Sequence, residues 1–159
     1  MGDLDLRPKP GSLTARVFEN INIGLPPTLF FDIEIPLEPF EYDGETEETT
    51  VRLDFIEFKV GDWRALPGKN FTFPTNPTLG YIDGSMYLAG AHNPADVTAI
   101  RCRALENDLL RAEVDLRFDF TYEGPEELGV VAVSWPVELV VDPSQLDAAF
   151  AEARRQGAL

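Results

Sequence analysis

The 159-residue chain is poor in the side chains that most often carry chemistry, with one cysteine, Cys102, and one histidine, His92. A single cysteine excludes an intrachain disulfide, and one cysteine with one histidine cannot form a structural zinc site of the Cys/His kinds. Cys102 alternates with arginines in the stretch IRCRA, which predicts a buried thiol with no base beside it in sequence. The chain also lacks the phosphate-binding glycine patterns GxxxxGK[ST] and GxGxxG. We therefore expect no cofactor and no metal.

Positive charge is also scarce, because 13 basic residues stand against 28 acidic ones and give a net charge of −15. This exceeds the magnitude of about 2–8 that suits a small soluble domain. Such a charge repels phosphate backbones and anionic lipids, so we expect neither a nucleic acid nor a membrane as partner. It attracts cationic proteins, and a basic protein is the partner that the composition favours.

Long hydrophobic runs are absent, since the longest wholly apolar stretches, such as VVAV, are far shorter than a membrane span. The first residues, MGDLDLRPKPGS, have no apolar segment and carry two early aspartates, unlike a secretory signal. These features predict a soluble cytoplasmic protein.

Most of the chain shows an alternation of apolar and polar residues with a period of two. The clearest example runs from Leu110 to Tyr122, where the apolar side chains share one face and the charged ones the other. This pattern is typical of an antiparallel strand with one buried face. Further strands are predicted at 13–19, 28–35, 50–60, 79–89, 96–105 and 129–141, with a change of phase near Phe55 that suggests a bulge.

These patterns predict one all-β domain, an antiparallel β-sandwich-like fold of about seven strands and two layers. The boundaries we expect are a loose tail over 1–12, the sandwich over 13–142 and a C-terminal helix over 143–156. Asp142 is placed to cap that helix, Gln145 to complete a capping box, and Gly157 to end the helix. A single curved sheet covered by the helix is the alternative fold.

An acidic segment with aromatic residues is the first candidate binding surface. Ten acidic residues lie between Asp32 and Glu57, against Arg52 as the one basic residue. The candidate partner-binding residues are Glu41, Tyr42, Asp43, Glu45, Glu47 and Glu48. Acidic groups around an aromatic side chain favour docking on a basic protein, because the charges steer the encounter and the ring provides a hot spot. A solvated loop whose aromatic residues bury in the core is the simpler interpretation.

A second candidate surface is the stretch 61–77, which is rich in proline, glycine and asparagine. Its aromatic residues Trp63, Phe71 and Phe73 are candidates for binding a small ligand or a carbohydrate. Such aromatic residues more often fix a loop to a sheet.

His92 is the third candidate, because it is the sole imidazole and has Asp83 and Asp96 nearby in sequence. Its neighbours Gly90, Asn93 and Pro94 are turn formers, which predict a hairpin connection rather than a catalytic centre. The leading hypothesis is therefore a non-catalytic protein-binding domain, such as an inhibitor or an immunity protein against a basic bacterial toxin. The alternatives are a ligand-binding module and an enzyme centred on His92.

Overall fold

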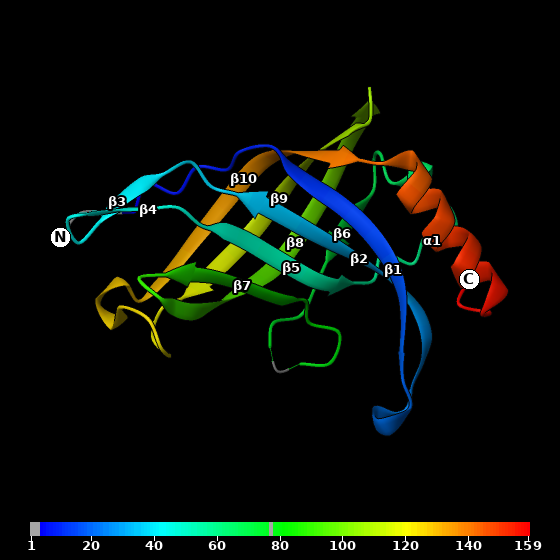
Figure 1. Ribbon diagram of the computed structural model, residues 1–159, viewed down its shortest axis with the longest axis horizontal. Helices are drawn as coiled ribbons and strands as arrows, with labels where there is room; N and C mark the ends of the chain where they lie inside the picture. Colours follow the sequence, from blue (N-terminus) through cyan, green and yellow to red (C-terminus); the bar gives the residue numbers. More distant parts are fainter. Residues whose placement is uncertain (1–3, 77) are drawn as a thin grey trace.

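The computed structural model describes residues 4–76 and 78–159 and consists mostly of β-strands (Figure 1). The strands are β1 (Gly11–Asn20), β2 (Leu25–Pro36), β3 (Phe40–Tyr42), β4 (Glu45–Glu47), β5 (Thr50–Ile56), β6 (Asn70–Thr72), β7 (Asp83–Leu88), β8 (Ala91–Glu106), β9 (Leu109–Asp119) and β10 (Val130–Val141). The described residues also contain one α-helix, α1 (Pro143–Arg155), which follows β10. It is too short and too polar to cross a membrane.

Seven of the strands form a closed mixed barrel in the order β8–β7–β5–β2–β1–β10–β9, and β9 returns to pair with β8. All the pairs in the ring are antiparallel except that of β1 with β10, which is parallel and spans Gly11–Leu13. The 16-residue strand β8 closes the ring, because it pairs along one edge with β9 and along the other with β7 and then with β6.

The expected β-sandwich is therefore wrong, although the all-β class and the C-terminal helix are confirmed. A sandwich has two sheets with free edges, whereas here β8 joins β7 to β9 and β1 joins β2 to β10. The alternation of buried and exposed residues is the same in a sandwich and in a barrel, because both bury one face of each strand. Periodicity alone could not reveal which strands pair.

The barrel interior is filled by the apolar face of each strand. In β9 the side chains of Leu110, Val114 and Phe118 are buried, while the alternating Arg111 and Arg117 are exposed, as the sequence predicts. The β8–β9 turn consists of Asn107 and Asp108, both with positive φ, and this is the geometry that asparagine and aspartate tolerate in a two-residue hairpin.

The predicted change of phase in β5 is a β-bulge at Phe55, whose φ is +62°. The bulge puts Asp54 and Phe55 on the outside of the barrel, beside Arg16 of β1 and Asp32 of β2. Asp32 accepts hydrogen bonds from Arg16 Nε at 2.7 Å and from the Phe55 N–H at 3.2 Å. The Arg16 guanidinium lies 4.3 Å from the centre of the Phe55 ring. These contacts compensate for the strained backbone at Phe55.

Helix α1 covers the end of the barrel opposite the β3–β4 hairpin (Figure 1). Its buried stripe includes Leu146 and Phe150, and the Phe150 ring packs against Phe31 of β2 with centroids 5.8 Å apart. Asp142 caps the helix through the N–H of Ser144, and Gly157, with φ +71°, ends it. The expected capping box is incomplete, because the Gln145 side chain bonds to β1 instead of to Asp142.

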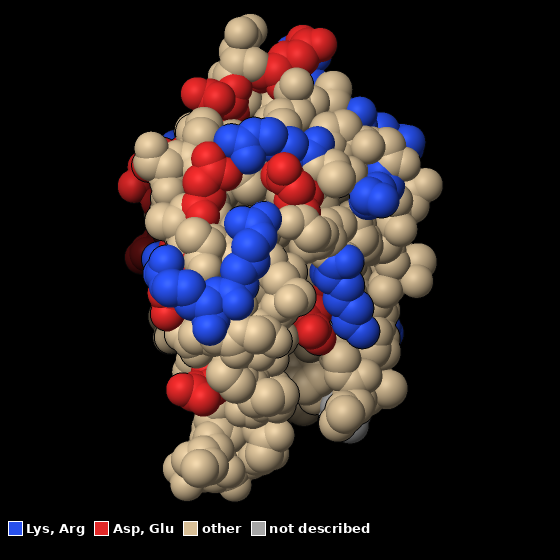
Figure 2. Space-filling view, turned by 90° about the vertical axis from the view of Figure 1, so that its right-hand side faces the viewer, with Lys and Arg blue, Asp and Glu red and all other residues tan. Residues whose placement is uncertain are grey.

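The segment that follows β5 closes the same end of the barrel. Trp63 is buried there, and its indole N–H donates to Asp147 Oδ1 of α1 at 2.9 Å. Arg64 donates to both carboxylate oxygens of Asp147 at 2.8 and 2.9 Å and lies over the Trp63 ring. Figure 2 shows Lys and Arg side chains gathered on this face of the molecule, with Asp and Glu between them.

The N-terminal residues described, from Leu4 onward, are held against the barrel. The Lys9 N–H donates to the Pro36 carbonyl at 2.7 Å, and the Glu38 N–H donates to the Arg7 carbonyl at 2.8 Å. These bonds lie at the base of the β3–β4 hairpin and fix the direction in which it leaves the barrel.

Candidate functional site

The acidic residues predicted to bind a partner lie on a two-stranded hairpin, β3–β4, that extends beyond the barrel (Figure 1). Its turn is Asp43-Gly44, with φ of +51° and +79°, the values that a type I′ turn requires. At its base Phe40 is buried in the core, so the hairpin is anchored by one aromatic residue and exposes its carboxylates.

The carboxylates of this hairpin are directed to solvent. Glu41, Asp43, Glu45 and Glu48 are exposed, and Glu47 is half-buried. Glu41 accepts a hydrogen bond from Thr46 Oγ1 at 2.6 Å across the hairpin. None of the five forms an ion pair with the Lys and Arg residues in the described part of the chain. Their negative charge is therefore not neutralised within the protein.

Tyr42 joins this hairpin to the loop between β9 and β10. Its hydroxyl donates to Glu127 Oε1 at 2.5 Å, although the two residues are 85 positions apart in sequence. The hydrogen bond to the Glu127 carboxylate raises the pKa of Tyr42 to about 12, because ionisation would remove the proton that Tyr42 donates, and desolvation and the negative charge of Glu127 add to the shift. The same bond lowers the pKa of Glu127.

We call the combined surface of residues 40–48 and 121–129 the acidic end. The β9–β10 loop adds three exposed carboxylates, Glu123, Glu126 and Glu127, and neither segment contains Lys or Arg. It also adds Tyr122, whose side chain is 73% exposed. Sequence reasoning missed these residues. The stretch TYEGPEE could have indicated a binding surface, because it is acidic and contains an aromatic residue. Its closeness to the β3–β4 hairpin, however, depends on how the barrel closes.

The β7–β8 hairpin borders the acidic end, and it contains His92. Its turn is Ala89-Gly90, with φ of +52° and +77°, so His92 lies within β8 and not in the connection that we expected. The His92 ring packs against Tyr87 of β7, with centroids 5.3 Å apart, and both side chains are exposed. Asn93 is buried beneath the β9–β10 loop, where its Oδ1 faces Gly124.

The two aspartates proposed as partners of His92 lie elsewhere on the same hairpin. Asp83 and Asp96 are each about four residues along their strands from Tyr87 and His92, which corresponds to about 13 Å. Among the described residues no hydrogen bond joins either carboxylate to the imidazole, and Asp96 instead accepts from the Asn76 N–H at 3.5 Å. The structure therefore does not assemble His92 with an acid.

The aromatic residues of the stretch 61–77 pack on one another and on the core. Trp63 is buried and gives its N–H to Asp147, and Phe71 and Phe73 are half-buried against Phe58, with centroids 4.6 and 6.5 Å from it. This arrangement fixes a long loop to the barrel. Ligand binding by these three residues stays a prediction.

No known family, curated protein or solved structure matches this chain. Among the described residues no three His, Cys, Asp or Glu side chains are grouped as metal ligands. Cys102 is buried, and burial raises the pKa of its thiol to about 11, so it is protonated at neutral pH.

Proposed function

We propose that this chain is a non-catalytic binding protein whose acidic end docks on a basic surface of another protein. The observation that carries this proposal is the hydrogen bond between Tyr42 and Glu127. It brings two acidic segments, distant in sequence, together as one surface with no Lys or Arg in either segment.

The charge of this surface favours rapid association with a cationic protein. Carboxylates that have no ion partner among the described residues contribute to the field that attracts an approaching cationic protein, and such steering raises association rates in an ionic-strength-dependent way. The ring of Tyr122 within the acidic end is exposed, and so is that of Tyr87 on the bordering β7–β8 hairpin. Tyrosine is common among interface hot spots, because it buries a large area and keeps a polar tip.

The shape of the acidic end favours binding as well. The type I′ turn and the Tyr42–Glu127 bond fix the hairpin before a partner arrives, so little conformational entropy is lost on binding. A specific form of the proposal is a cytoplasmic immunity protein or inhibitor that neutralises a basic bacterial toxin. The strong negative charge then speeds capture of the toxin.

The test compares two variants that remove the same charge from different places. The first is D43N/E45Q/E48Q, which removes three exposed carboxylates from the hairpin and keeps an αL-tolerant residue in the turn. This variant, the control variant described below and the wild-type protein are each immobilised and used to capture proteins from cells of the source organism. The captured proteins are identified by mass spectrometry, and the association rate of each is measured at increasing salt.

The matched control is E19Q/E106Q/D108N, which also removes three exposed carboxylates and also places Asn at an αL turn position, where Asp108 has φ +58°. We expect a basic protein that binds wild type and the control equally and binds the hairpin variant at least tenfold more slowly. Its association rate should fall steeply with salt. Equal binding to the two variants, or a partner whose association rate is insensitive to salt, would contradict the proposal.

A further inference from the structure

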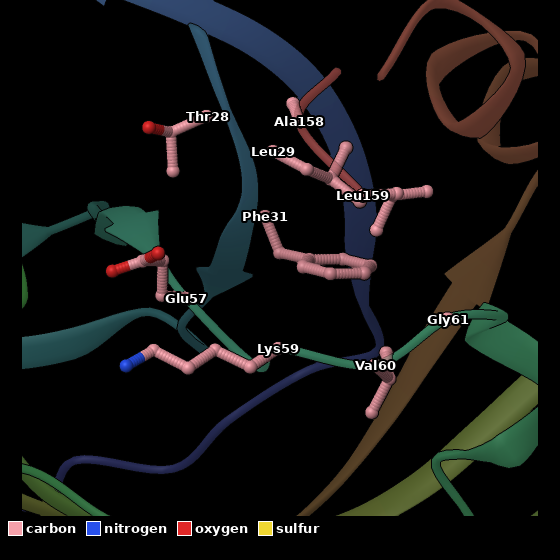
Figure 3. Close-up of a pocket in the computed structure, with 9 residues that line it drawn as sticks. All are labelled: Thr28, Leu29, Phe31, Glu57, Lys59, Val60, Gly61, Ala158 and Leu159. Atoms are coloured by element: carbon pink, nitrogen blue, oxygen red, sulfur yellow. The ribbon is translucent and has the colours of Figure 1, made fainter. Parts of the chain in front are cut away.

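A pocket of about 370 Å³ opens beside the residues that follow α1, and none of its lining residues belongs to the acidic end (Figure 3). It lies between the start of β2, the segment that follows β5 and the residues after α1. The residues that line it are Thr28, Leu29, Phe31, Glu57, Lys59, Val60, Gly61, Ala158 and Leu159. Its volume is at the small end of the range for ligand pockets, about 300–1,000 Å³.

One side of the pocket is apolar. Leu29, Phe31 and Val60 form its wall and are themselves buried from the outer solvent, while Leu159 forms the rim and is 48% exposed. The Ala158 N–H donates to the Ala153 carbonyl at 2.7 Å, which fixes the residues after the helix in this position. A ligand with an apolar body would cover the exposed part of Leu159 and remove this apolar surface from water.

The other side of the pocket is polar, and it carries a cation that no carboxylate neutralises. The side chains of Lys59 and Glu57 extend away from the apolar wall (Figure 3). Lys59 forms no ion pair with the described acidic residues, Glu57 included. Its backbone has a φ of +55°, which is costly for a lysine.

A second cation lies beside the pocket. Arg154 of α1 donates from Nη2 to the carbonyl of Gly61, a lining residue, at 3.3 Å. The lining itself holds one cation, Lys59, and one carboxylate, Glu57, while Arg154, which also interacts with Asp147, lies beside it. An anionic ligand group would give Lys59 the partner that it lacks among the described residues.

We infer that this pocket binds a small amphiphilic anion, with its apolar body against Phe31 and Leu159 and its anionic group at Lys59. An aliphatic carboxylate of medium chain length has this chemistry. The site is separate from the acidic end and does not depend on the proposed docking function.

The test uses decanoate, below its micellar concentration, as the probe and decyltrimethylammonium as a ligand of equal chain length and opposite charge. Backbone amide chemical shifts are followed by NMR during each titration. We expect decanoate to shift the amides of Val60, Gly61 and Leu159 in a saturable manner, and the cationic ligand to bind at least tenfold more weakly. Decanoate shifts confined to other residues, or equal affinity for both ligands, would overturn the inference.

Two variants test the contributions of the Lys59 charge and of the apolar wall to decanoate binding separately. K59N should weaken decanoate binding about tenfold, because it removes the cation that pairs with the carboxylate. Asparagine tolerates the positive φ, so this variant should remain folded. K69N removes a lysine outside the pocket and serves as the matched control. L159A should weaken decanoate binding without changing the preference for the anion. Equal affinities of K59N and K69N would refute a role for Lys59.

Discussion

The side-chain amide of Gln145 hydrogen-bonds to the backbone of Ala15 as a neighbouring strand would. Its Oε1 accepts from the Ala15 N–H at 3.1 Å, and its Nε2 donates to the Ala15 carbonyl at 2.5 Å. Strand β10 pairs with β1 only as far as Leu13. Beyond Leu13, β10 no longer pairs with β1. There the Gln145 side chain of α1 bonds to the N–H and the C=O of Ala15 in place of a strand.

We expect Q145A to lower the free energy of unfolding by about 1–3 kcal/mol, because it leaves a partly buried N–H and C=O without partners. Urea unfolding of wild type and variant measures this difference. Q156A is the control, since Gln156 directly follows α1, is exposed, and its side chain bonds to Glu152 of that helix. Its effect should stay within about 0.5 kcal/mol. Equal losses in the two variants would show that Gln145 does not complete the β1 edge.

The elements that depend on nearby residues could be predicted from the sequence. The alternation from Leu110 onward predicts β9, Asn107-Asp108 predicts its turn, and Asp142 and Gly157 predict the ends of α1. Each signal acts within a few residues along the chain.

What could not be predicted depends on contacts between distant residues. The pairing of Leu13 with Val141 joins the first and last strands of the barrel, and no local pattern encodes it. The same limit applies to the candidate site. The hairpin around Asp43 could be identified from its charge and its turn residues. The contact between Tyr42 and Glu127, in contrast, depends on the closure of the barrel.

Gly124 lies so close to Asn93 that a larger residue does not fit. A Cβ added to Gly124 would lie 2.0 Å from Asn93 Oδ1. Asn93 is buried and cannot rotate without losing the bonds from its Nδ2 to the carbonyls of Met86 at 3.2 Å and Ala91 at 3.0 Å. We expect G124A to destabilise the protein by about 1–3 kcal/mol, the usual cost of overpacking.

Thermal unfolding by circular dichroism tests this expectation, with G61A as the control. An added Cβ at Gly61 meets nothing within 4 Å, and the φ of Gly61 is not positive. G61A should therefore unfold at or slightly above the wild-type temperature, because alanine restricts the unfolded chain. A melting temperature of G124A equal to that of G61A would mean that the loop moves away from Asn93 at no cost.

The Tyr42–Glu127 bond should be visible in the alkaline titration of the tyrosines. The pKa of Tyr42 is raised to about 12 by its hydrogen bond to the Glu127 carboxylate. In the ultraviolet phenolate band we expect wild type to show a component that titrates near pH 12 and that Y42F lacks. In E127Q this component should move to lower pH, because the amide carries no charge. A difference spectrum between wild type and Y42F that is complete well below pH 12 would contradict the bond.

Asp115 should contribute stability that is lost in acid. Its carboxylate accepts from two nitrogens of Arg101, at 2.9 and 2.7 Å, and from Ser134 Oγ at 2.6 Å. These bonds lower its pKa from 3.8 to about 2. The folded state therefore binds fewer protons than the unfolded state, and the stabilisation is fully present above about pH 4 and is lost as the pH falls toward 2. In urea unfolding between pH 5 and 2, D115N should show a shallower loss of stability than wild type. Parallel curves would exclude this contribution.

Asp54 should have the opposite effect on stability. Burial is the main cause of its raised pKa, and the Asp32 charge and a hydrogen bond to Asp32 add to it. Because the folded state holds the proton more tightly than the unfolded state, the charged form of Asp54 destabilises the fold at neutral pH, and this penalty disappears as the pH falls below the raised pKa. D54N removes the charge and keeps a group that can donate to Asp32. We expect D54N to be more stable than wild type at pH 7 and to lose this advantage in acid, in the same unfolding experiment. A lower stability of D54N at pH 7 would show that the Asp54 carboxylate is held ionised by Arg16 rather than opposed by Asp32.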